Sequence, residues 1–213
     1  MSLIGKEISD FTVQAFADGK FREVSKADVV GKWAVFFFYP ADFTFVCPTE
    51  LEDLANKYEE FKAAGCEIYS VSCDSHFVHK AWHDASDTIK KIKYPMLADP
   101  TGRLARDFEV MIEADGMAER GSFIVNPEGR IVAYEVIAGN VGRNADELYR
   151  RVQASQFVAE HRKFNVYVRR SGLPCQVAAR SGDTETESGS CRPDLTESDS
   201  ERYFLRRVYG TIL

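Results

Sequence analysis

Long apolar runs and a secretion signal are both missing from this sequence of 213 residues. No stretch approaches about eighteen consecutive apolar residues, so we expect no membrane-spanning helix. The first residues, MSLIGKEISDF, lack a basic region followed by a long apolar segment, which argues against a signal peptide. An excess of positive charge is also lacking. The formal net charge of −6 argues against nucleic acid or an anionic membrane as the main partner. A cytoplasmic location is the resulting expectation.

The sequence has few cysteines, and their number is odd. Without a secretion signal, an odd number argues against a disulfide framework and for reduced thiols, some of which can be catalytic. Cys47 is not part of a C-x-x-C pair, which excludes dithiol exchange within one motif, and Asp53 stands where a cysteine phosphatase has arginine. No glycine-rich phosphate loop follows a predicted strand, so a nucleotide-binding domain is a weak alternative. The five cysteines are Cys47, Cys66, Cys73, Cys175 and Cys191.

The composition, with 45% apolar and 28% charged residues, is that of a globular protein with one well-buried domain. Strand-like apolar runs alternate with segments whose apolar residues recur every three or four positions, as in amphipathic helices. This alternation predicts an α/β fold with a central mixed sheet flanked by helices. The run WAVFFFYP predicts a strand buried on both faces. The predicted strands are residues 33–40 and 66–74 and a hairpin over 121–136, and the predicted helices are residues 48–63, 76–90 and 145–159.

From Arg162 onward the character of the sequence changes. The last 52 residues contain one lysine and eight arginines, whereas the first 161 contain ten lysines and eight arginines. Residues 180–201 are rich in Ser, Thr and Glu and have almost no apolar content, a composition typical of disorder. We predict one domain over residues 1–161 and an atypical, disordered tail over residues 162–213.

The segment YPADFTFVCPTE, residues 39–50, carries the clearest chemical signal. It follows a predicted buried strand and leads into a predicted helix. Cys47 is expected at the N-cap, Pro48 at the first helical position and Glu50 in the first turn, where it suits the helix dipole. The unpaired N–H groups and partial positive charge of a helix N-terminus stabilise a thiolate, which is the nucleophilic form of cysteine.

Pro40, Thr44 and Cys47 stand in the highly specific spacing P-x3-T-x2-C. With this motif and the segments VSCDSHFVHKAWHD, YPMLADP and ERGSFIVNPEG, the chain resembles typical two-cysteine peroxiredoxins of the bacterial alkyl hydroperoxide reductase type. The resemblance covers residues 1–161 nearly continuously. It implies a thioredoxin-like fold and a thiol peroxidase that acts through a sulfenic acid at Cys47. It also implies that the protein uses neither a cofactor nor a metal.

The resemblance further implies a role for each site residue. The Thr44 hydroxyl hydrogen-bonds the thiolate and the peroxide, Arg120 holds the thiolate and polarises the O–O bond, and Pro40 shields the site from water. A guanidinium beside the sulfur can also stabilise charge that develops on the leaving oxygen. The alternatives are an inert, buried Cys47 and an ordinary surface Arg120.

The remaining candidate groups are interpreted as structural. Cys66 and Cys73 lie in or beside a predicted strand, where buried thiols are common. His76, His79 and His83 are three and four residues apart, which puts them on one helical face. Histidine is a common metal ligand. We nevertheless interpret these three as packing or interface residues, with adventitious metal binding as the alternative.

The tail departs from the family that the chain resembles. That family carries a second, resolving cysteine in a C-terminal motif reading roughly Val-Cys-Pro-Ala-Lys-Trp, which is absent here. Codons compatible with residues 172–179, when read one base later, permit Ala-Cys-Pro-Ala-Lys-Trp-Arg, followed by a family-like end. We therefore hypothesise a frameshift between about His161 and Gly172. Cys175 is the candidate for a makeshift resolving cysteine, ahead of Cys191, because ordering a disordered tail costs entropy.

The resemblance also implies partners. These are a peroxide substrate, a flavin-linked disulfide reductase or thioredoxin as electron donor, and a second copy of the chain in a homodimer that can join into a ring. The expected function is antioxidant defence and redox homeostasis, with hydrogen peroxide and organic hydroperoxides as substrates. The alternative is a peroxide-sensing or chaperone-like oligomer with little turnover, and the rate of peroxide consumption separates the two.

Overall fold

The computed structural model describes residues 2–160, 164–168 and 174–179. By its internal contacts the chain divides into two units, Met1–Tyr149 and Arg150–Leu213. The boundary falls inside helix α4 (Ala145–Glu160).

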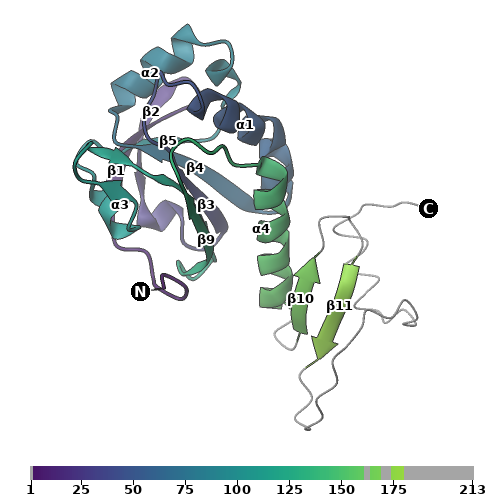
Figure 1. Ribbon diagram of the computed structural model, residues 1–213. Coiled ribbons are helices and arrows are strands. Elements are labelled where there is room, and N and C mark those ends of the chain that lie inside the picture. Colours follow the sequence, from purple (N-terminus) through teal and green to yellow (C-terminus); the bar gives the residue numbers. More distant parts are fainter. Residues whose placement is uncertain (1, 161–163, 169–173, 180–213) are drawn as a thin grey trace. The chain divides into compact units, whose positions relative to one another are not determined.

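A mixed sheet of seven strands forms the centre of the first unit (Figure 1). Its strands are β1 (Thr12–Ala17), β2 (Lys20–Ser25), β3 (Trp33–Phe38), β4 (Cys66–Ser72), β5 (Met96–Ala98), β8 (Arg120–Val125) and β9 (Ile131–Ile137). They lie in the order β2-β1-β5-β4-β3-β8-β9. β4 is parallel to both β3 and β5, and the other neighbouring pairs are antiparallel.

Helices flank this sheet, and together they confirm the predicted α/β architecture. α1 packs against β4, and α2 packs against β1 and β5. The smaller elements are two 3-10 turns, a one-turn helix and a two-stranded ribbon. The bounds of these elements are η1 (Lys26–Asp28), α1 (Cys47–Ala63), α2 (His76–Ala85), η2 (Ile89–Lys91), α3 (Arg103–Asp107), β6 (Met111–Ile112) and β7 (Met117–Ala118).

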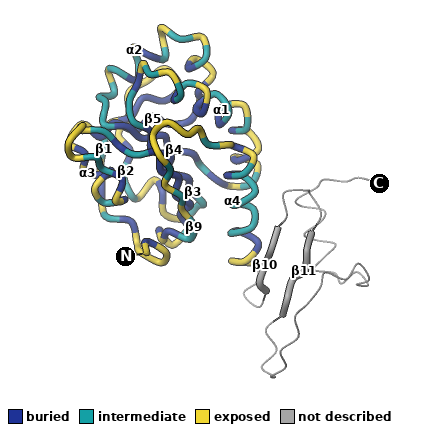
Figure 2. Tube along the Cα trace, in the orientation of Figure 1, coloured by how far each residue is buried: buried dark blue, intermediate teal, exposed yellow. Residues whose placement is uncertain are grey.

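The predicted strands are all present. β3 lies between β4 and β8, and its residues 34–38 are all buried (Figure 2). This burial on both faces explains why the strand is a continuous apolar run. β4 is the second predicted strand, and β8 and β9 form the predicted hairpin, in which the Gly129 N–H closes the turn onto the Asn126 carbonyl.

One predicted helix is shorter than expected. The apolar spacing predicted a helix over residues 76–90, but α2 ends at Ala85 because Ser86 adopts an extended backbone, with φ −115° and ψ 121°. A separate 3-10 turn, η2, follows. The periodicity continued across the break because Ile89 is also buried, and burial of an apolar side chain does not require an unbroken helix.

The register of the sheet brings distant parts of the sequence to one edge. β8 runs antiparallel to β3, with Phe37 opposite Ser122. Arg120, at the start of β8, therefore lies beside the carboxyl end of β3, where the chain leaves the sheet toward α1. The carboxyl ends of β4 and β5 reach the same edge because these strands run in the direction of β3.

Four aromatic rings fill the core on one side of β3. Phe108 lies 5.0 Å from Phe36, 5.1 Å from Phe38 and 4.9 Å from Phe123, measured between ring centroids. All four side chains are buried. Edge-to-face and tilted pairs at these distances are favourable beyond the burial of apolar area alone.

The second unit contains the rest of α4 and a two-stranded antiparallel ribbon. The ribbon pairs β10 (Phe164–Val168) with β11 (Pro174–Ala179), and Tyr167 lies opposite Cys175. Both strands fall within the predicted tail, residues 162–213. Residues 180–201, for which we predicted disorder, lie outside the described residues, as does Cys191.

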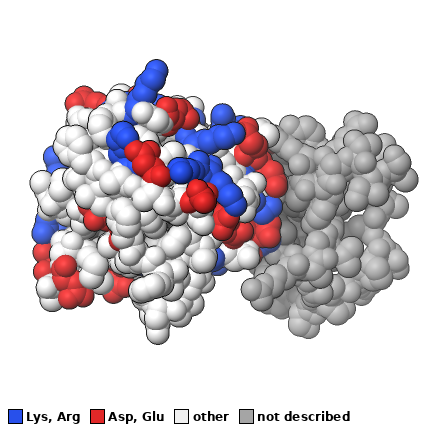
Figure 3. Space-filling model, turned by 90° about the horizontal axis from the view of Figure 1, so that it is seen from above, with Lys and Arg blue, Asp and Glu red and all other residues white. Residues whose placement is uncertain are grey.

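The surface carries charges of both signs. In Figure 3, acidic and basic side chains are interspersed over part of one face, beside a broad area without charged groups. Exposed pairs such as Lys91 with Glu52 are worth only about 0–1 kcal/mol each, so the stability of the first unit comes mainly from its core. Among the described residues, no helix has both the length and the apolar character needed to cross a membrane.

Replacing Phe123 by alanine tests the importance of the aromatic core. We expect the free energy of unfolding to fall by about 3–5 kcal/mol, because the substitution leaves a cavity among three other rings. Urea denaturation followed by circular dichroism measures the change. Phe45→Ala is the control, since Phe45 is 97% exposed and its loss should change stability by less than about 0.5 kcal/mol. Equal effects of the two substitutions would contradict the assignment of the core.

Candidate active site

Cys47 lies at the start of α1, just after the loop that leaves β3. The helix begins one residue earlier than predicted: Val46 is the N-cap, because its carbonyl accepts the Glu50 N–H at 3.4 Å. Cys47 is therefore the first helical residue and Pro48 the second. The Cys47 side chain has no exposed surface, so its chemistry depends on the groups packed around it.

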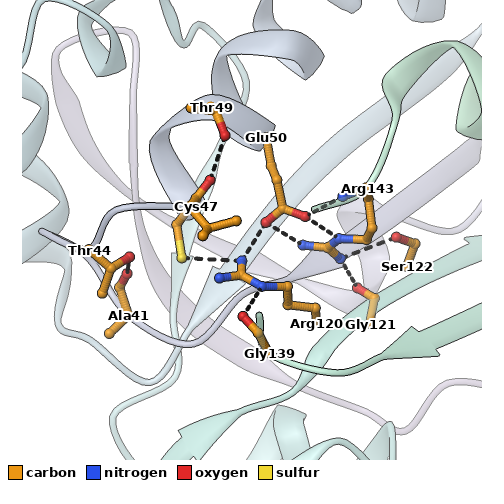
Figure 4. A network of polar contacts seen from close by, with 11 residues as sticks. Ala41, Thr44, Cys47, Thr49, Glu50, Arg120, Gly121, Ser122, Gly139 and Arg143 are labelled. Atoms are coloured by element: carbon orange, nitrogen blue, oxygen red, sulfur yellow. Dashed lines mark hydrogen bonds and ion pairs between the residues drawn. The ribbon is translucent and has the colours of Figure 1, made fainter. Parts of the chain in front are cut away.

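Arg120 is the basic group that contacts the Cys47 sulfur. Its Nη1 lies 3.3 Å from Sγ, and its Nε donates to the Gly139 carbonyl at 2.7 Å (Figure 4). The Arg120 side chain is only 4% exposed. The alternative of an ordinary surface arginine is thus wrong, and the structure brings together Cys47 and Arg120, which are 73 residues apart in the sequence.

Glu50 is the acidic group that balances Arg120. It stands three residues after Cys47, so both side chains lie on the same face of α1. Its Oε2 forms an ion pair with Arg120 Nη1, and its Oε1 accepts from the Arg143 N–H at 2.8 Å and from Arg143 Nε at 2.9 Å. The Glu50 side chain is 2% exposed. One buried carboxylate therefore bridges two guanidinium groups, which is a larger role than the favourable helix-dipole interaction that we predicted.

Arg143 is a site residue that the sequence analysis missed. It lies between β9 and α4, and its Nη1 donates to the Gly121 carbonyl at 2.9 Å and to Ser122 Oγ at 3.2 Å. Its guanidinium carbon lies 3.3 Å from the centre of the Phe37 ring. Burial lowers the pKa of Arg143 and the Glu50 carboxylate opposes that shift, and an arginine remains charged at physiological pH.

Nothing in the sequence around Arg143 distinguishes it from a surface arginine. Its neighbours, Gly142 and Asn144, are typical of a loop before a helix. Gly121, in contrast, directly follows Arg120, which the sequence analysis predicted as a site residue. A Cβ atom at Gly121 would lie 2.7 Å from the Phe123 ring and 2.9 Å from Val110, so only glycine fits between Arg120 and the core.

The cluster combines two cations with one anion. Arg120 and Arg143 contribute two positive charges and Glu50 one negative charge, all of them buried. Buried charges are costly unless they are paired, and the Cys47 sulfur lies directly beside the Arg120 guanidinium.

Thr44 and Pro40 lie in the loop between β3 and α1, and both are half-buried. The Thr44 hydroxyl donates to the Ala41 carbonyl at 2.9 Å. In the view of Figure 4, Thr44 and Arg120 lie on opposite sides of the Cys47 sulfur. A hydroxyl has one proton to donate and two lone pairs, so in this arrangement the Thr44 oxygen is free to accept a hydrogen bond but not to donate one to the sulfur.

The other thiols have surroundings that suppress their reactivity. Burial raises the pKa of the Cys66 thiol well above its ordinary value. Burial also raises the pKa of Cys73 to about 11, and its Sγ lies 4.0 Å from the Met111 sulfur. Both are unpaired, as expected for structural thiols. Cys175 lies in β11, in the second unit.

The three histidines of α2 have separate surroundings. The His76 ring packs edge-to-face against Phe21, the His83 ring packs against Phe16, and His79 is fully buried. Within the part of the chain that the structure describes, no group of three or more His, Cys, Asp or Glu side chains could hold a metal ion. The packing interpretation of these histidines agrees with their contacts.

Three comparisons with known proteins agree with this site. The model of the AhpC/TSA family matches residues 4–134. Alkyl hydroperoxide reductase C of Salmonella typhimurium is 56% identical over 161 residues, which is 76% of this chain and 86% of the relative. The crystal structure of Enterococcus faecalis AhpC has a TM-score of 0.75 and 60% identity, covering 76% of this chain and 96% of that chain. A reduced 2-Cys peroxiredoxin of Plasmodium vivax has a TM-score of 0.74 and 29% identity, covering 79% and 89%. These likenesses confirm the expected thioredoxin-like fold.

Replacing Glu50 by glutamine tests the central charge of the cluster. The substitution leaves two buried guanidinium groups without a carboxylate, so we expect a loss of about 3–5 kcal/mol in the free energy of unfolding. Glu52→Gln, on the same helix, is the matched control because its ion pair with Lys91 is exposed and worth less than about 1 kcal/mol. Urea denaturation compares the two variants. If Glu50→Gln were as stable as Glu52→Gln, Glu50 would not be the residue that holds the two arginines.

Proposed function

The chain belongs to the AhpC/TSA family, and from that premise we propose that Cys47 is the residue with which it reduces hydrogen peroxide and organic hydroperoxides. It is a peroxiredoxin-type peroxidase, an oxidoreductase of antioxidant defence. The observation that carries the assignment of Cys47 is its 3.3 Å contact with Arg120 inside the buried cluster of Arg120, Glu50 and Arg143.

The reaction is a nucleophilic displacement on oxygen. The Cys47 thiolate attacks one peroxide oxygen, an S–O bond forms and the O–O bond breaks. The sulfur is oxidised to a sulfenic acid, and the departing oxygen takes up a proton to give water or an alcohol. Arg120 is placed to stabilise the negative charge that develops on the departing oxygen, because a preorganised donor acts strongly where water is excluded.

Thr44 and Pro40 complete the proposed site. Because the Thr44 hydroxyl already donates to the Ala41 carbonyl, we assign it the acceptor role. It receives the hydrogen bond of the peroxide O–H and so orients the peroxide toward the sulfur. Pro40, half-buried at the start of the same loop, limits the access of water. Arg143 does not contact the sulfur in the described contacts, and its role is to hold Glu50 and, through Glu50, Arg120.

Return of the sulfenic acid to the thiol needs a second thiol and an electron donor. Residues 162–213 lack the family's resolving motif. We therefore propose Cys175 as the residue that attacks the sulfenic acid, with Cys191 as the second choice. The disulfide is then reduced by a disulfide reductase, either flavin-linked or thioredoxin. Under the frameshift hypothesis, Cys175 is a makeshift resolving cysteine in an altered tail.

The peroxidase is expected to act as a homo-oligomer, and we propose a homodimer that can join into a ring. We also propose a cytoplasmic location, which the unpaired thiols of Cys47, Cys66 and Cys73 support because reducing compartments keep thiols free. The absence of the family's resolving motif from residues 162–213 favours the alternative of a peroxide-sensing protein. A chain without a resolving cysteine would stay oxidised after one reaction, and such a state reports peroxide rather than consuming it.

Replacing Cys47 by serine should abolish peroxide consumption, because a serine hydroxyl is not ionised and does not form a sulfenic acid. We expect the loss to exceed about 1,000-fold, while Cys66→Ser and Cys73→Ser keep the activity of the parent protein. Peroxide consumption under excess reductant is the measurement. Full activity of the Cys47→Ser variant would contradict the assignment of Cys47 as the residue that reduces peroxide.

The intact mass of the non-reduced protein, before and after one equivalent of hydrogen peroxide, tests the resolving step. If Cys175 resolves Cys47 across two subunits, we expect a covalent dimer that reductant returns to monomer and that Cys175→Ser does not form. A monomer that gains one oxygen and then a second would contradict a resolving role for the tail. The starting mass also shows whether the tail, residues 162–213, is made.

A further inference from the structure

A second buried polar cluster includes a residue of the loop that leads to Cys47. It consists of Tyr39 at the end of β3, Asp42 in the loop and His79 in α2. The Asp42 and His79 side chains have no exposed surface, and Tyr39 is fully buried. Buried polar groups of this kind persist only when their hydrogen bonds are satisfied.

Asp42 is bonded to three different elements. Its Oδ1 accepts the Tyr39 hydroxyl at 2.7 Å, and its Oδ2 lies 2.8 Å from His79 Nδ1. Its backbone N–H donates to Asp74 Oδ2 at 2.8 Å, just after β4. Asp74 is itself held by the Ser72 hydroxyl at 2.8 Å. A single loop residue is therefore tied to β3, to α2 and to the end of β4.

Both ring nitrogens of His79 have hydrogen-bond partners. Nε2 lies 3.1 Å from the Leu97 carbonyl in β5, and Nδ1 lies 2.8 Å from Asp42 Oδ2. The ring therefore connects the loop, through Asp42, to β5 in a place without solvent.

The aromatic residues in the middle of the loop are exposed and have few described contacts. Phe43 has a positive φ of 55°, a conformation that costs energy for a residue with a large side chain. The Phe43 ring is 57% exposed and has one described ring contact, with Trp82 at 6.0 Å, and Phe45 is 97% exposed. A strained and exposed loop opens unless a specific contact opposes the opening.

We propose that the buried hydrogen bond between Asp42 and His79 holds residues 40–46 closed over Cys47, which makes Asp42 and His79 positioning residues for peroxide reduction. The closed loop keeps the Cys47 sulfur buried and Thr44 beside it. The proposal rests on the function proposed above for Cys47 and adds the groups that hold its loop.

The titratable groups around the pair come from three sides. Tyr39 faces Asp42 from the end of β3, and Asp74 faces the Asp42 backbone from the end of β4. From β5 the described contact is the Leu97 carbonyl, which does not titrate. Burial, followed by the adjacent Asp42 carboxylate, raises the pKa of Tyr39, so Tyr39 stays a donor.

Two reactions of Cys47 distinguish positioning from general destabilisation. Reduction of hydrogen peroxide requires the closed loop, because a misplacement of about 1 Å at a reacting group can cost about 100-fold in rate. Alkylation of Cys47 by iodoacetamide requires the opened loop, because the sulfur is otherwise buried. The same digest reports alkylation of Cys66, which is buried in β4 and shows whether the fold is intact.

The experiment uses the full-length, reduced protein with Asp42→Ala, Asp42→Asn and Asp84→Ala. Asp42→Ala should slow peroxide reduction by about 100-fold and speed alkylation of Cys47 by at least about tenfold, with Cys66 unchanged. Asp42→Asn should recover most of both losses, because its amide can donate to His79 Nδ1 and accept from Tyr39. Asp84→Ala, an exposed aspartate of α2 paired with Lys80, should behave as the parent protein.

The opposite changes of the two rates, with recovery of both in Asp42→Asn, are the readout that a merely structural role would not produce. Asp42→Ala and His79→Ala should not be additive, because each removes the same tie.

Two outcomes would contradict the proposal, and a third would contradict the function on which it rests. If Asp42→Ala reduces peroxide at the parental rate and leaves Cys47 unlabelled, the pair does not hold the loop. If Cys47 and Cys66 are labelled together, Asp42 supports the whole fold and the proposal is overturned. If the parent protein reduces no peroxide, the proposed function of Cys47 fails, and the alkylation rates still test the tie.

Discussion

The Glu50 carboxylate lies between two buried guanidinium groups, and the chemistry of the site depends on that bridge. Arg120 cannot stay next to the Cys47 sulfur without a nearby negative charge, because an unpaired buried cation is costly. Glu50 balances one of the two arginines, and the second positive charge remains for the sulfur and the peroxide. The same bridge fixes the positions of the donors, so little reorganisation is needed when the O–O bond breaks.

The sheet explains how these groups come together. Because β8 is antiparallel to β3 and β3 is parallel to β4, the start of β8 and the ends of β3, β4 and β5 lie at one edge. The loop with Cys47 leaves from this edge. The arginine cluster holds it at the start of α1, and Asp42 with His79 contacts it nearer to β3. The loop is thus held by one buried polar cluster at the start of α1 and by another nearer to β3.

The first unit and the tail have different consequences for function. All groups of the proposed attack on peroxide lie in Met1–Tyr149, so this step does not need the atypical tail. Recycling does need a second thiol, and the tail that begins near Arg162 is where the sequence departs from the family it otherwise resembles. A chain of this kind can therefore keep the first half of the catalytic cycle while the second half is altered.

The sequence by itself determined the fold class and part of the site. The apolar run of β3, the amphipathic spacing of α1 and the P-x3-T-x2-C motif are local patterns, and local patterns are visible in a sequence. Two features were decided only by the tertiary structure: the role of Glu50, which looked like a helix-dipole residue, and the place of Arg143, which looked like a loop residue. Glu50 and Arg143 are 93 residues apart in the sequence. They meet because of the register of β3 and β8 and the position of the loop after β9. The hydrogen bond between His79 and Asp42 was likewise not predictable, because it depends on which groups surround the ring in the folded chain.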